Sequence, residues 1–211
     1  MSIGPSPVRF RVKGEYACFT RPEMKTERVS YEVMTPSAAR GVLEAILWKP
    51  AIRWRIERIH VLAPIRLASI RRNEVKSKLS VTGNVDRYFA SDDRSQRNAL
   101  VLRDVDYIVE ARFEMTDRVG PKDNPGKFRD MIERRLASGA CFHRPYLGCR
   151  EFAADVERAP VDWTVDESLE GERDLGLMLH DLDFNSDGTA TPRFFHAVMK
   201  DGVIDVPRGA L

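Results

Sequence analysis

TPSAARGVLEAILWKPAIRWRIERIHVL, residues 35–62, joins the signal for a helix directly to the signal for a strand. Thr35 is a good N-cap, and Pro36 suits the first helical position. Up to Pro50, which ends the helix, the apolar residues repeat with helical spacing as Ala39, Val42, Leu43 and Ile46. Residues 51–62 alternate between apolar and basic side chains, which is typical of a half-buried strand. The stretch therefore predicts a helix followed by a strand, with a change of phase near Glu57 that a β-bulge would cause.

Further elements lie on both sides of this pair. Residues 8–19 and residues 105–115 alternate in the same way and predict two more strands. A second helix is expected over residues 125–138, and residues 141–152 are the candidate for the next strand. The order strand, helix, strand, strand, helix, strand is the βαββαβ arrangement. We expect an α+β protein built on a ferredoxin-like (RRM-like) domain.

The remaining segments predict additions to that domain. Residues 64–99 are polar, charged and weakly periodic, with Gly83 in the middle, so we expect a long excursion or a flexible hairpin. The tail holds the apolar runs 174–184 and 193–207, and Asp201-Gly202 is a hairpin turn signal. We expect residues 1–152 to form the ferredoxin-like domain and residues 153–211 a small β-rich C-terminal region.

The charge of the chain is uneven along its length. Its formal net charge is +2, yet residues 1–150 carry 29 Lys and Arg against 18 Asp and Glu, and residues 151–190 carry 2 against 12. A basic body suggests a polyanion as partner. The alternative is that the two charges balance each other across the protein's own surface, and charge alone does not separate these readings.

Composition and motifs exclude several classes of function. No stretch approaches the roughly 18 apolar residues of a membrane span, and MSIGPSPVRF holds no apolar signal segment. Three cysteines without C-x-x-C spacing predict a cytoplasmic protein without a disulfide framework or zinc site. The four histidines are scattered, and Walker A, G-x-G-x-x-G and G-x-S-x-G motifs are absent from the sequence. We expect no metal and no cofactor.

The second helix, NPGKFRDMIERRLASG at 124–139, begins in an unusual way. Asn124 caps it, Pro125 occupies the first position and Gly139 ends it. Lys127 lies in the first turn, where the helix dipole disfavours a cation. One interpretation is that an anion such as phosphate binds at this helix end. The alternative is a surface lysine offset by Asp130 and Glu133.

Basic residues on the strands are candidates for phosphate contacts. The alternation places Arg9 and Arg11 on one face of the first strand, and Arg53 and Arg55 on one face of the second. A shared face would suit a nucleic-acid backbone, which contributes affinity but little sequence information. The alternative is a solvated face with local ion pairs.

Several segments together resemble one family. They are FRVKGEYACFTRPEMKTERVSYEVMTPSAARGVLEAILWKP at 10–50, the second helix at 124–139, YLGCREF at 146–152 and RFFHAVMKDGVIDVP at 193–207. These segments resemble the type I-C (Dvulg) CRISPR-associated Cas-five proteins of the RAMP superfamily. The resemblance implies a ferredoxin-like, RNA-binding domain and a β-rich C-terminal region.

The resemblance also implies an activity. Such proteins bind the repeat hairpin of the CRISPR transcript, cleave it without metal through attack of a 2′-hydroxyl, and stay on the guide as a subunit of the interference complex. Its other subunits, the backbone and large subunits, would be protein partners, and DNA is a further candidate ligand. In the family, a lysine followed by histidine at this helix start, and a tyrosine just before W-K-P, belong to the active site. Lys127 matches the lysine, but Phe128 and Leu47 occupy the other two positions.

Two hypotheses follow from this departure. In the first, the protein is an endoribonuclease in which Lys127 stabilises the phosphate and Tyr31, His143 or Tyr146 supplies the acid–base chemistry. Its RNA backbone contacts would be Arg9, Arg11, Arg53, Arg55, Arg129 and Arg134. In the second, the protein is a non-catalytic scaffold subunit that only binds RNA or DNA. The resemblance to the family favours the first hypothesis, and the Leu47–Phe128 pair favours the second.

Overall fold

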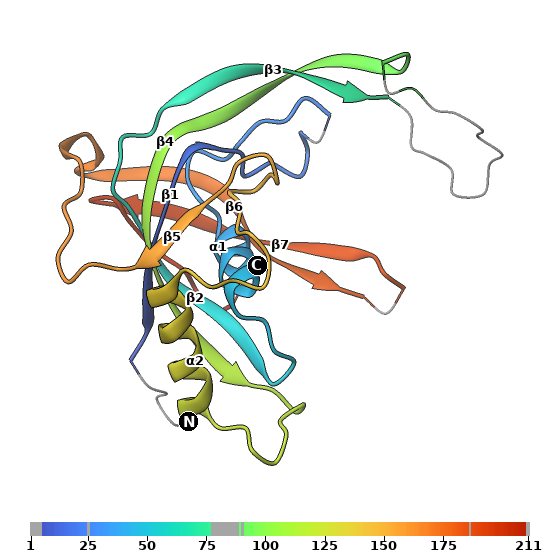
Figure 1. The fold of residues 1–211 in the computed structure, drawn as a ribbon. Helices are drawn as coiled ribbons and strands as arrows, with labels where there is room; N and C mark the ends of the chain where they lie inside the picture. Colours follow the sequence, from blue (N-terminus) through green and yellow to red (C-terminus); the bar gives the residue numbers. More distant parts are fainter. Residues whose placement is uncertain (1–5, 25, 77–88, 90, 186, 210–211) are drawn as a thin grey trace.

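The protein folds around one antiparallel sheet of eight strands and few helices, a mixed α/β architecture (Figure 1). The computed structural model describes residues 6–24, 26–76, 89, 91–185 and 187–209. The strands are β1 (Val8–Ala17), β2 (Ile52–Val61), β3 (Leu67–Val75), β4 (Arg94–Met115), β5 (Asp155–Arg158), β6 (Glu172–Phe184), β7 (Ala190–Lys200) and β8 (Val203–Asp205). The helices are α1 (Pro36–Ile46), α2 (Pro125–Ser138) and a short 3-10 turn, Glu167–Leu169. Among the described residues, no helix is long and apolar enough to cross a membrane.

The quoted stretch folds into α1 and β2, as predicted. The Thr35 side chain accepts a hydrogen bond from the backbone N–H of Ala38 at 3.2 Å. The helix ends at Ile46, four residues before Pro50, because Leu47 already adopts extended backbone angles. The predicted β-bulge is confirmed by a register shift between Ile56 and Arg58.

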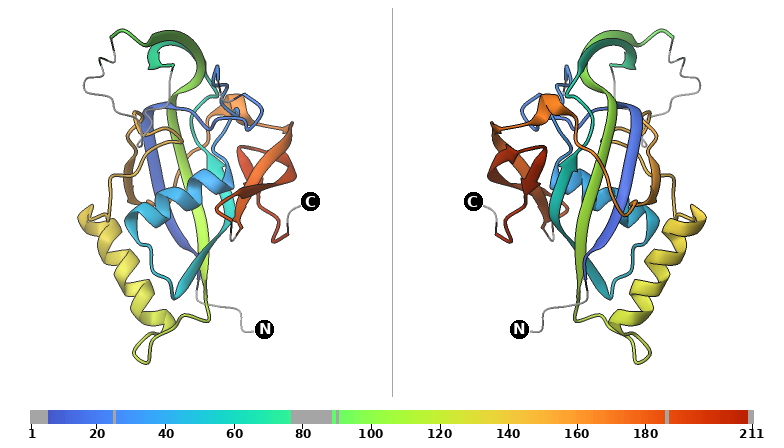
Figure 2. Two further views of the ribbon diagram at one scale, coloured as in Figure 1. Left: turned by 90° about the vertical axis from the view of Figure 1, so that its right-hand side faces the viewer. Right: turned by 90° about the vertical axis from the view of Figure 1, so that its left-hand side faces the viewer.

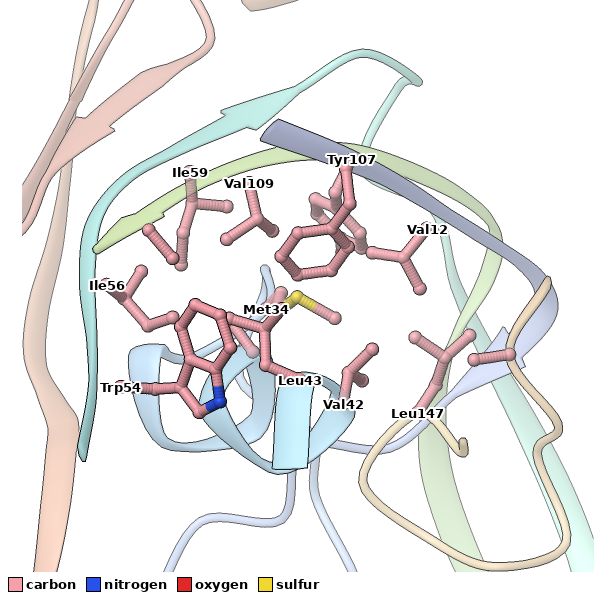
Figure 3. Close-up of a cluster of buried hydrophobic side chains, with 14 of the residues drawn as sticks. Val12, Met34, Val42, Leu43, Trp54, Ile56, Ile59, Tyr107, Val109 and Leu147 are labelled. Carbon is pink, nitrogen blue, oxygen red and sulfur yellow. The ribbon is translucent and has the colours of Figure 1, made fainter. Parts of the chain in front are cut away.

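Both helices lie on the same face of the sheet (Figure 2). Trp54 of β2 faces Phe113 of β4 across the ladder, and the Trp54 indole N–H donates to the carbonyl of Leu47 at the end of α1. The Phe113 ring in turn contacts Phe128 of α2, with ring centroids 6.4 Å apart. The buried core fills the space between this face and α1 (Figure 3); its largest members include Met34, Leu43, Ile59, Tyr107 and Leu147.

The strand order of the sheet is β5-β1-β4-β2-β8-β7-β6, and β3 pairs with β4 outside this path. The strand predicted at 105–115 is the second half of β4, whose first half pairs with β3. The change of partner occurs near Asp104, which has a positive φ of 53°. The expected excursion at 64–99 therefore contains a paired hairpin, and its centre, residues 77–88, lies outside the described residues.

The strand predicted at 141–152 is wrong. This segment forms a loop that turns back on itself, with the Leu147 N–H donating to the Phe152 carbonyl at 2.8 Å and Gly148 at a φ of +81°. A backbone that reverses there cannot extend along a neighbour, so the strand beside β1 is β5. The predicted boundary at residue 152 therefore falls just before a strand that pairs with the first domain.

The C-terminal strands continue the same sheet. Strands β6, β7 and β8 form a meander, and β8 pairs with β2. The turn at Asp201-Gly202 is confirmed, with φ values of 48° and 76° that match the hairpin geometry the sequence indicates. The segment 193–207 thus contains parts of two strands, β7 and β8, on either side of the predicted turn.

Candidate active site

The start of α2 carries the feature that the sequence singled out. The Asn124 side chain accepts a hydrogen bond from the Lys127 N–H at 2.9 Å, and Pro125 occupies the first turn. The first turn contains no acidic residue. Gly139 ends the helix in the left-handed conformation, as predicted. The free N–H groups and dipole of this helix end therefore face no carboxylate within the helix itself.

The Lys127 side chain is held beside this helix end. Its Nζ lies 2.8 Å from Asp123 Oδ1, and the ammonium lies 5.6 Å from the centroid of the Phe128 ring. The hydrogen bond from Lys127 and a second one from the Gly120 N–H keep the pKa of Asp123 below its ordinary value. The lysine is 43% exposed, so solvent and a ligand reach it.

A hollow of about 330 Å³ opens beside Lys127. Three cationic side chains, Lys49, Arg118 and Lys127, line it together with one carboxylate, Asp123. Its apolar wall includes Phe128 and Met131. A concave site with excess positive charge at a helix N-terminus has the properties that bind a phosphate.

The two positions that depart from the family pattern lie in the core. Leu47 is fully buried, and Phe128 is 2% exposed and packs edge-on against Phe113. Neither side chain transfers a proton. Their burial shows that both residues stabilise the contact of α1 and α2 with the sheet.

Tyr31, a predicted acid–base candidate, is also buried. It is 2% exposed, and the guanidinium of Arg21 lies 4.5 Å from the centroid of its ring. Burial raises the pKa of Tyr31, against the effects of Arg21 and of a hydrogen bond with the Leu179 backbone. Tyr31 is not among the residues that line the hollow beside Lys127.

His143 and Tyr146 lie beyond the other end of α2. The backbone N–H groups of Phe142 and His143 donate to the Ala45 carbonyl at 2.8 and 3.2 Å, and Tyr146 pairs with Ala153. From Lys127 to the last residue of α2 the helix rises about 16 Å, at 1.5 Å per residue. The structure therefore does not bring His143 or Tyr146 to the hollow beside Lys127.

A second hollow, of about 250 Å³, lies at this far end of α2. Arg135 and Arg144 line it together with Cys141 and Asp155. The Arg135 guanidinium also donates to the Ile46 carbonyl. This hollow is lined by two cationic side chains, against three in the first, and lies at the helix C-terminus, where the dipole disfavours an anion.

The four strand arginines share one face of the sheet, as predicted. The register places Arg9 opposite Glu110, Arg11 opposite Ile108 and Arg53 opposite Glu114, on the side away from the helices. The face is nevertheless mixed in charge, because acidic residues of a neighbouring strand form ion pairs with three of these arginines. The pairs are Arg9 with Glu110 at 3.0 Å, Arg11 with Asp106 at 2.6 Å and Arg55 with Glu114 at 3.1 Å. This is the arrangement of local ion pairs that the sequence left open as an alternative.

The arginines of α2 are also engaged within the protein. Arg129 contacts Glu133 at 3.5 Å and donates to the carbonyl of Ser6, while Arg134 donates to the Asp130 carbonyl at 3.3 Å. Both still lie on the helix that begins at the first hollow. Within the described ranges, no group of three or more His, Cys, Asp or Glu is placed to hold a metal ion.

Sequence reasoning missed Lys49 and Arg118. Lys49 belongs to the W-K-P run that follows α1, and Arg118 follows the end of β4. The available signal was weak, since each is one basic residue in a connecting segment. Only the meeting of these two segments with α2 makes them neighbours of Lys127.

Comparison with known proteins places this architecture in a defined class. The chain matches a family model described as "CRISPR-associated protein (Cas_Cas5)" over residues 8–207. Among solved structures, it is similar to a CRISPR-associated protein (TM-score 0.71, 24% identity, 97% of this chain and 95% of that one). It is also similar to the functionally uncharacterized protein SMU1763c from Streptococcus mutans (TM-score 0.69, 23% identity, 95% and 92%). The class is therefore that of the Cas5 fold.

Curated relatives narrow the class to one family. The chain is 49% identical over 214 residues to the CRISPR pre-crRNA endoribonuclease Cas5d of Mannheimia succiniciproducens, which covers 95% of this chain and 94% of that protein. It is 44% identical over 218 residues to the protein of the same name from Thermus thermophilus, over 95% and 91%. The chain belongs to the Cas5d family.

Proposed function

We propose that this chain is a pre-crRNA endoribonuclease that binds the CRISPR repeat hairpin and cleaves it without a metal ion. The observation that carries the proposal is the cationic hollow at the N-terminus of α2, where Lys49, Arg118 and Lys127 converge. Two relatives at 49% and 44% identity carry the name of this activity. The hollow supplies what a scissile phosphate requires, which is positive charge on a preorganised surface.

The reaction is an internal transesterification. The 2′-oxygen attacks the adjacent phosphorus, the bond to the 5′-oxygen breaks, and the products are a cyclic 2′,3′-phosphate and a free 5′-hydroxyl. Negative charge grows on the non-bridging oxygens as the phosphate becomes crowded. In this proposal the Lys127 ammonium binds those oxygens, and Lys49 and Arg118 hold the adjoining backbone.

The two family positions that carry proton-transferring residues, Leu47 and Phe128, cannot supply an acid or a base for the reaction. A positioned acid or base typically contributes about 10²–10⁴-fold, and Leu47 and Phe128 supply neither. Of the four catalytic candidates, Lys127 alone lines the hollow. We therefore propose electrostatic stabilisation and positioning by Lys127 as the main catalytic contribution, and we expect His143→Ala and Tyr146→Phe to retain cleavage.

The test is cleavage of the cognate repeat hairpin in the presence of a chelator. Wild type is compared with Lys127→Ala and with Lys122→Ala, a control that removes an exposed lysine of the loop before α2, outside the hollow. We expect Lys127→Ala to lose cleavage by about 10²-fold or more while it still binds the hairpin, and Lys122→Ala to cleave like wild type. Equal cleavage by all three proteins would exclude the role of Lys127.

A second candidate function is a scaffold subunit that holds RNA without cutting it. The observation that favours it is the burial of Leu47 and Phe128 in the core. Binding of the hairpin by wild type without any cleavage would establish this second function. Loss of chelator-resistant cleavage in Lys127→Ala alone would exclude it.

Partners and architecture complete the proposal. The expected partners are the repeat hairpin, the backbone and large subunits of the type I-C interference complex and, in that complex, DNA; the expected compartment is the cytoplasm. We infer that β1-α1-β2-β4-α2-β5 is a ferredoxin-like unit, supported by the strand order β5-β1-β4-β2 and by two helices on one face. Its end would lie after β5, and β6–β8 would form the C-terminal region.

A further inference from the structure

Two cysteines that lie far apart in the sequence are neighbours in the structure. Cys18 follows β1, and Cys149 lies in the loop 146–152. The Cys18 N–H donates to the Leu147 carbonyl at 3.0 Å, and the Cys149 Sγ lies 3.7 Å from the Cys18 carbonyl oxygen. Gly148, with a φ of +81°, passes so close to the Cys18 carbonyl that a Cβ at this position would collide with it. The backbones that carry the two thiols are therefore fixed against each other.

A guanidinium is directed at one of these thiols. Arg28 Nη1 lies 3.1 Å from Cys149 Sγ and 3.5 Å from a carboxylate oxygen of Glu151. The same arginine approaches Glu74 of β3 at 3.6 Å, and Glu74 also contacts Arg72 and Arg97. Arg72 contacts Glu151 in addition. The charged groups around Cys149 are thus three arginines and two carboxylates, with Arg28 in contact with the sulfur.

These contacts give the two thiols opposite properties. The hydrogen bond from Cys18 and the charge of Arg28 lower the pKa of Cys149, against burial and the Glu151 carboxylate, which raise it. The same hydrogen bond and burial raise the pKa of Cys18. Buried cysteines without such a cation are ordinarily inert, because only the thiolate is nucleophilic.

We propose that Cys149 and Cys18 form a redox modification site, in which Cys149 reacts with a small oxidant such as a peroxide and Cys18 then closes an intramolecular disulfide. This site is independent of the proposed cleavage function. It lies near the base of the β3–β4 hairpin, where Arg28 links the loop 146–152 to β3.

The chemistry balances with hydrogen peroxide as the oxidant. The Cys149 thiolate attacks one peroxide oxygen, the O–O bond breaks, and a sulfenic acid and hydroxide form. The Cys18 sulfur then attacks the sulfenic sulfur, a disulfide forms, and the S–OH oxygen leaves as water with the Cys18 proton. Both cysteines are oxidised together by two electrons, and the peroxide is reduced.

Cys141 provides an internal control. It is the third cysteine, and it is exposed, whereas Cys18 and Cys149 are buried. Exposure alone would make Cys141 the most reactive thiol. Faster reaction of Cys149 at neutral or mildly acidic pH would instead reflect its contact with Arg28.

The experiment treats the full-length protein with hydrogen peroxide, blocks remaining thiols and maps the peptides by mass spectrometry without reduction. We expect a Cys18–Cys149 disulfide in the wild type, reversed by a thiol reductant, and a pH midpoint for iodoacetamide labelling of Cys149 below that of Cys141. Arg28→Ala should slow disulfide formation at pH 7 about twofold, because a rise of one unit from a thiol pKa of about 6 lowers the thiolate fraction from about nine-tenths to about one-half. Arg28→Lys should slow it less.

Two results would overturn the proposal. One is the absence of a Cys18–Cys149 disulfide while Cys141 is fully oxidised, because the pair would then be structural. The other is a labelling midpoint for Cys149 at or above that of Cys141. Both measurements use the wild-type protein, so they stand even where a variant fails to fold.

Discussion

At the residue scale, Asp123 regulates how much positive charge Lys127 offers to a ligand. Their ion pair spans 2.8 Å, and Asp123 is the sole carboxylate among the described residues that line the hollow. An RNA phosphate therefore competes with Asp123 for the same ammonium. The lowered pKa of Asp123 means that this competition persists down to acidic pH and ends only when pH falls through that pKa.

Removal of this carboxylate should strengthen RNA binding. We expect Asp123→Asn to raise hairpin affinity about threefold at low salt, the size of one charge interaction at several ångströms in water. The control is Asp117→Asn, which makes the same charge change at an exposed residue outside the hollow. Fluorescence anisotropy with labelled hairpin measures both, and equal affinities of the two variants would contradict the competition.

We expect Phe128 to contribute to the stability of the fold through its packing. Its ring is 2% exposed and packs against Phe113, so Phe128→Ala leaves a cavity between α2 and the sheet. We expect a loss of about 3–5 kcal/mol in the free energy of unfolding, measured by urea titration. Lys127→Ala, one residue away and exposed, should change it by less than about 0.5 kcal/mol. Similar losses in the two variants would contradict the packing role.

At the element scale, the start of α2 depends on its cap. The Asn124 side chain accepts the Lys127 N–H at 2.9 Å, and this bond fixes the first turn that carries Lys127. We expect Asn124→Ala to cost about 1 kcal/mol of unfolding free energy and to reduce cleavage more than binding. Asn124→Ser retains a capping oxygen and should restore both. If Asn124→Ser lost as much unfolding free energy as Asn124→Ala, the loss of the capping hydrogen bond would not be its cause.

Strand β2 contains a group that makes stability depend on pH. His60 is 9% exposed, lies 3.4 Å from Glu110 and meets the Trp163 ring edge to face. Burial lowers the pKa of His60, against Glu110, which raises it. The unfolded chain therefore takes up a proton at a higher pH than the folded one, and stability falls as pH drops below the unfolded histidine value of about 6.5.

His60→Gln should make this loss of stability shallower between pH 7 and pH 5. His143→Gln, which removes an exposed histidine, should leave the wild-type slope unchanged. Urea unfolding at each pH measures the slopes. A steeper fall in His60→Gln than in wild type would show that the histidine is stabilised in its charged form instead.

At the scale of the whole molecule, ion pairs formed on folding balance part of the uneven charge of the sequence. Acids of the segment 151–190 bind basic residues elsewhere: Glu151 contacts Arg28, Glu157 contacts Lys13, and Asp181 contacts Arg40. Three of the four strand arginines, Arg9, Arg11 and Arg55, are paired as well. Part of the positive charge of the basic body is therefore balanced within the protein, while in the hollow three cationic side chains face one carboxylate.

We expect the three cationic side chains of the hollow to set the salt dependence of RNA binding. Three side chains that each neutralise one phosphate, and so release counter-ions from the RNA, correspond to a fall in log affinity with a slope of about 2 against log salt. This is about a tenfold loss of affinity between 100 and 300 mM. Replacing Lys49, Arg118 and Lys127 together by alanine should remove most of that slope, while the triple replacement of Arg9, Arg11 and Arg55 should preserve it. The opposite pattern would place the RNA on the sheet face.

The parts of this fold that could be predicted from the sequence are those that nearby residues decide. Thr35-Pro36 and Asn124-Pro125 predict the starts of both helices, and Asp201-Gly202 predicts a turn, because caps and turns depend on residues a few positions apart. Alternation predicts β2 and the second half of β4. The same local signals identified Lys127 as unusual for its position.

Only the tertiary structure decided which of these elements meet. The strand after α2 is β5 and not residues 141–152, because Gly148 and the hydrogen bond between Leu147 and Phe152 reverse the chain there. Strand pairing between distant segments likewise brings Lys49 and Arg118 to Lys127, and Cys149 to Cys18. Local sequence determines the conformation of a segment. Which segments become neighbours depends on how apolar surface is buried across the whole chain, and the sequence of one segment alone does not specify this.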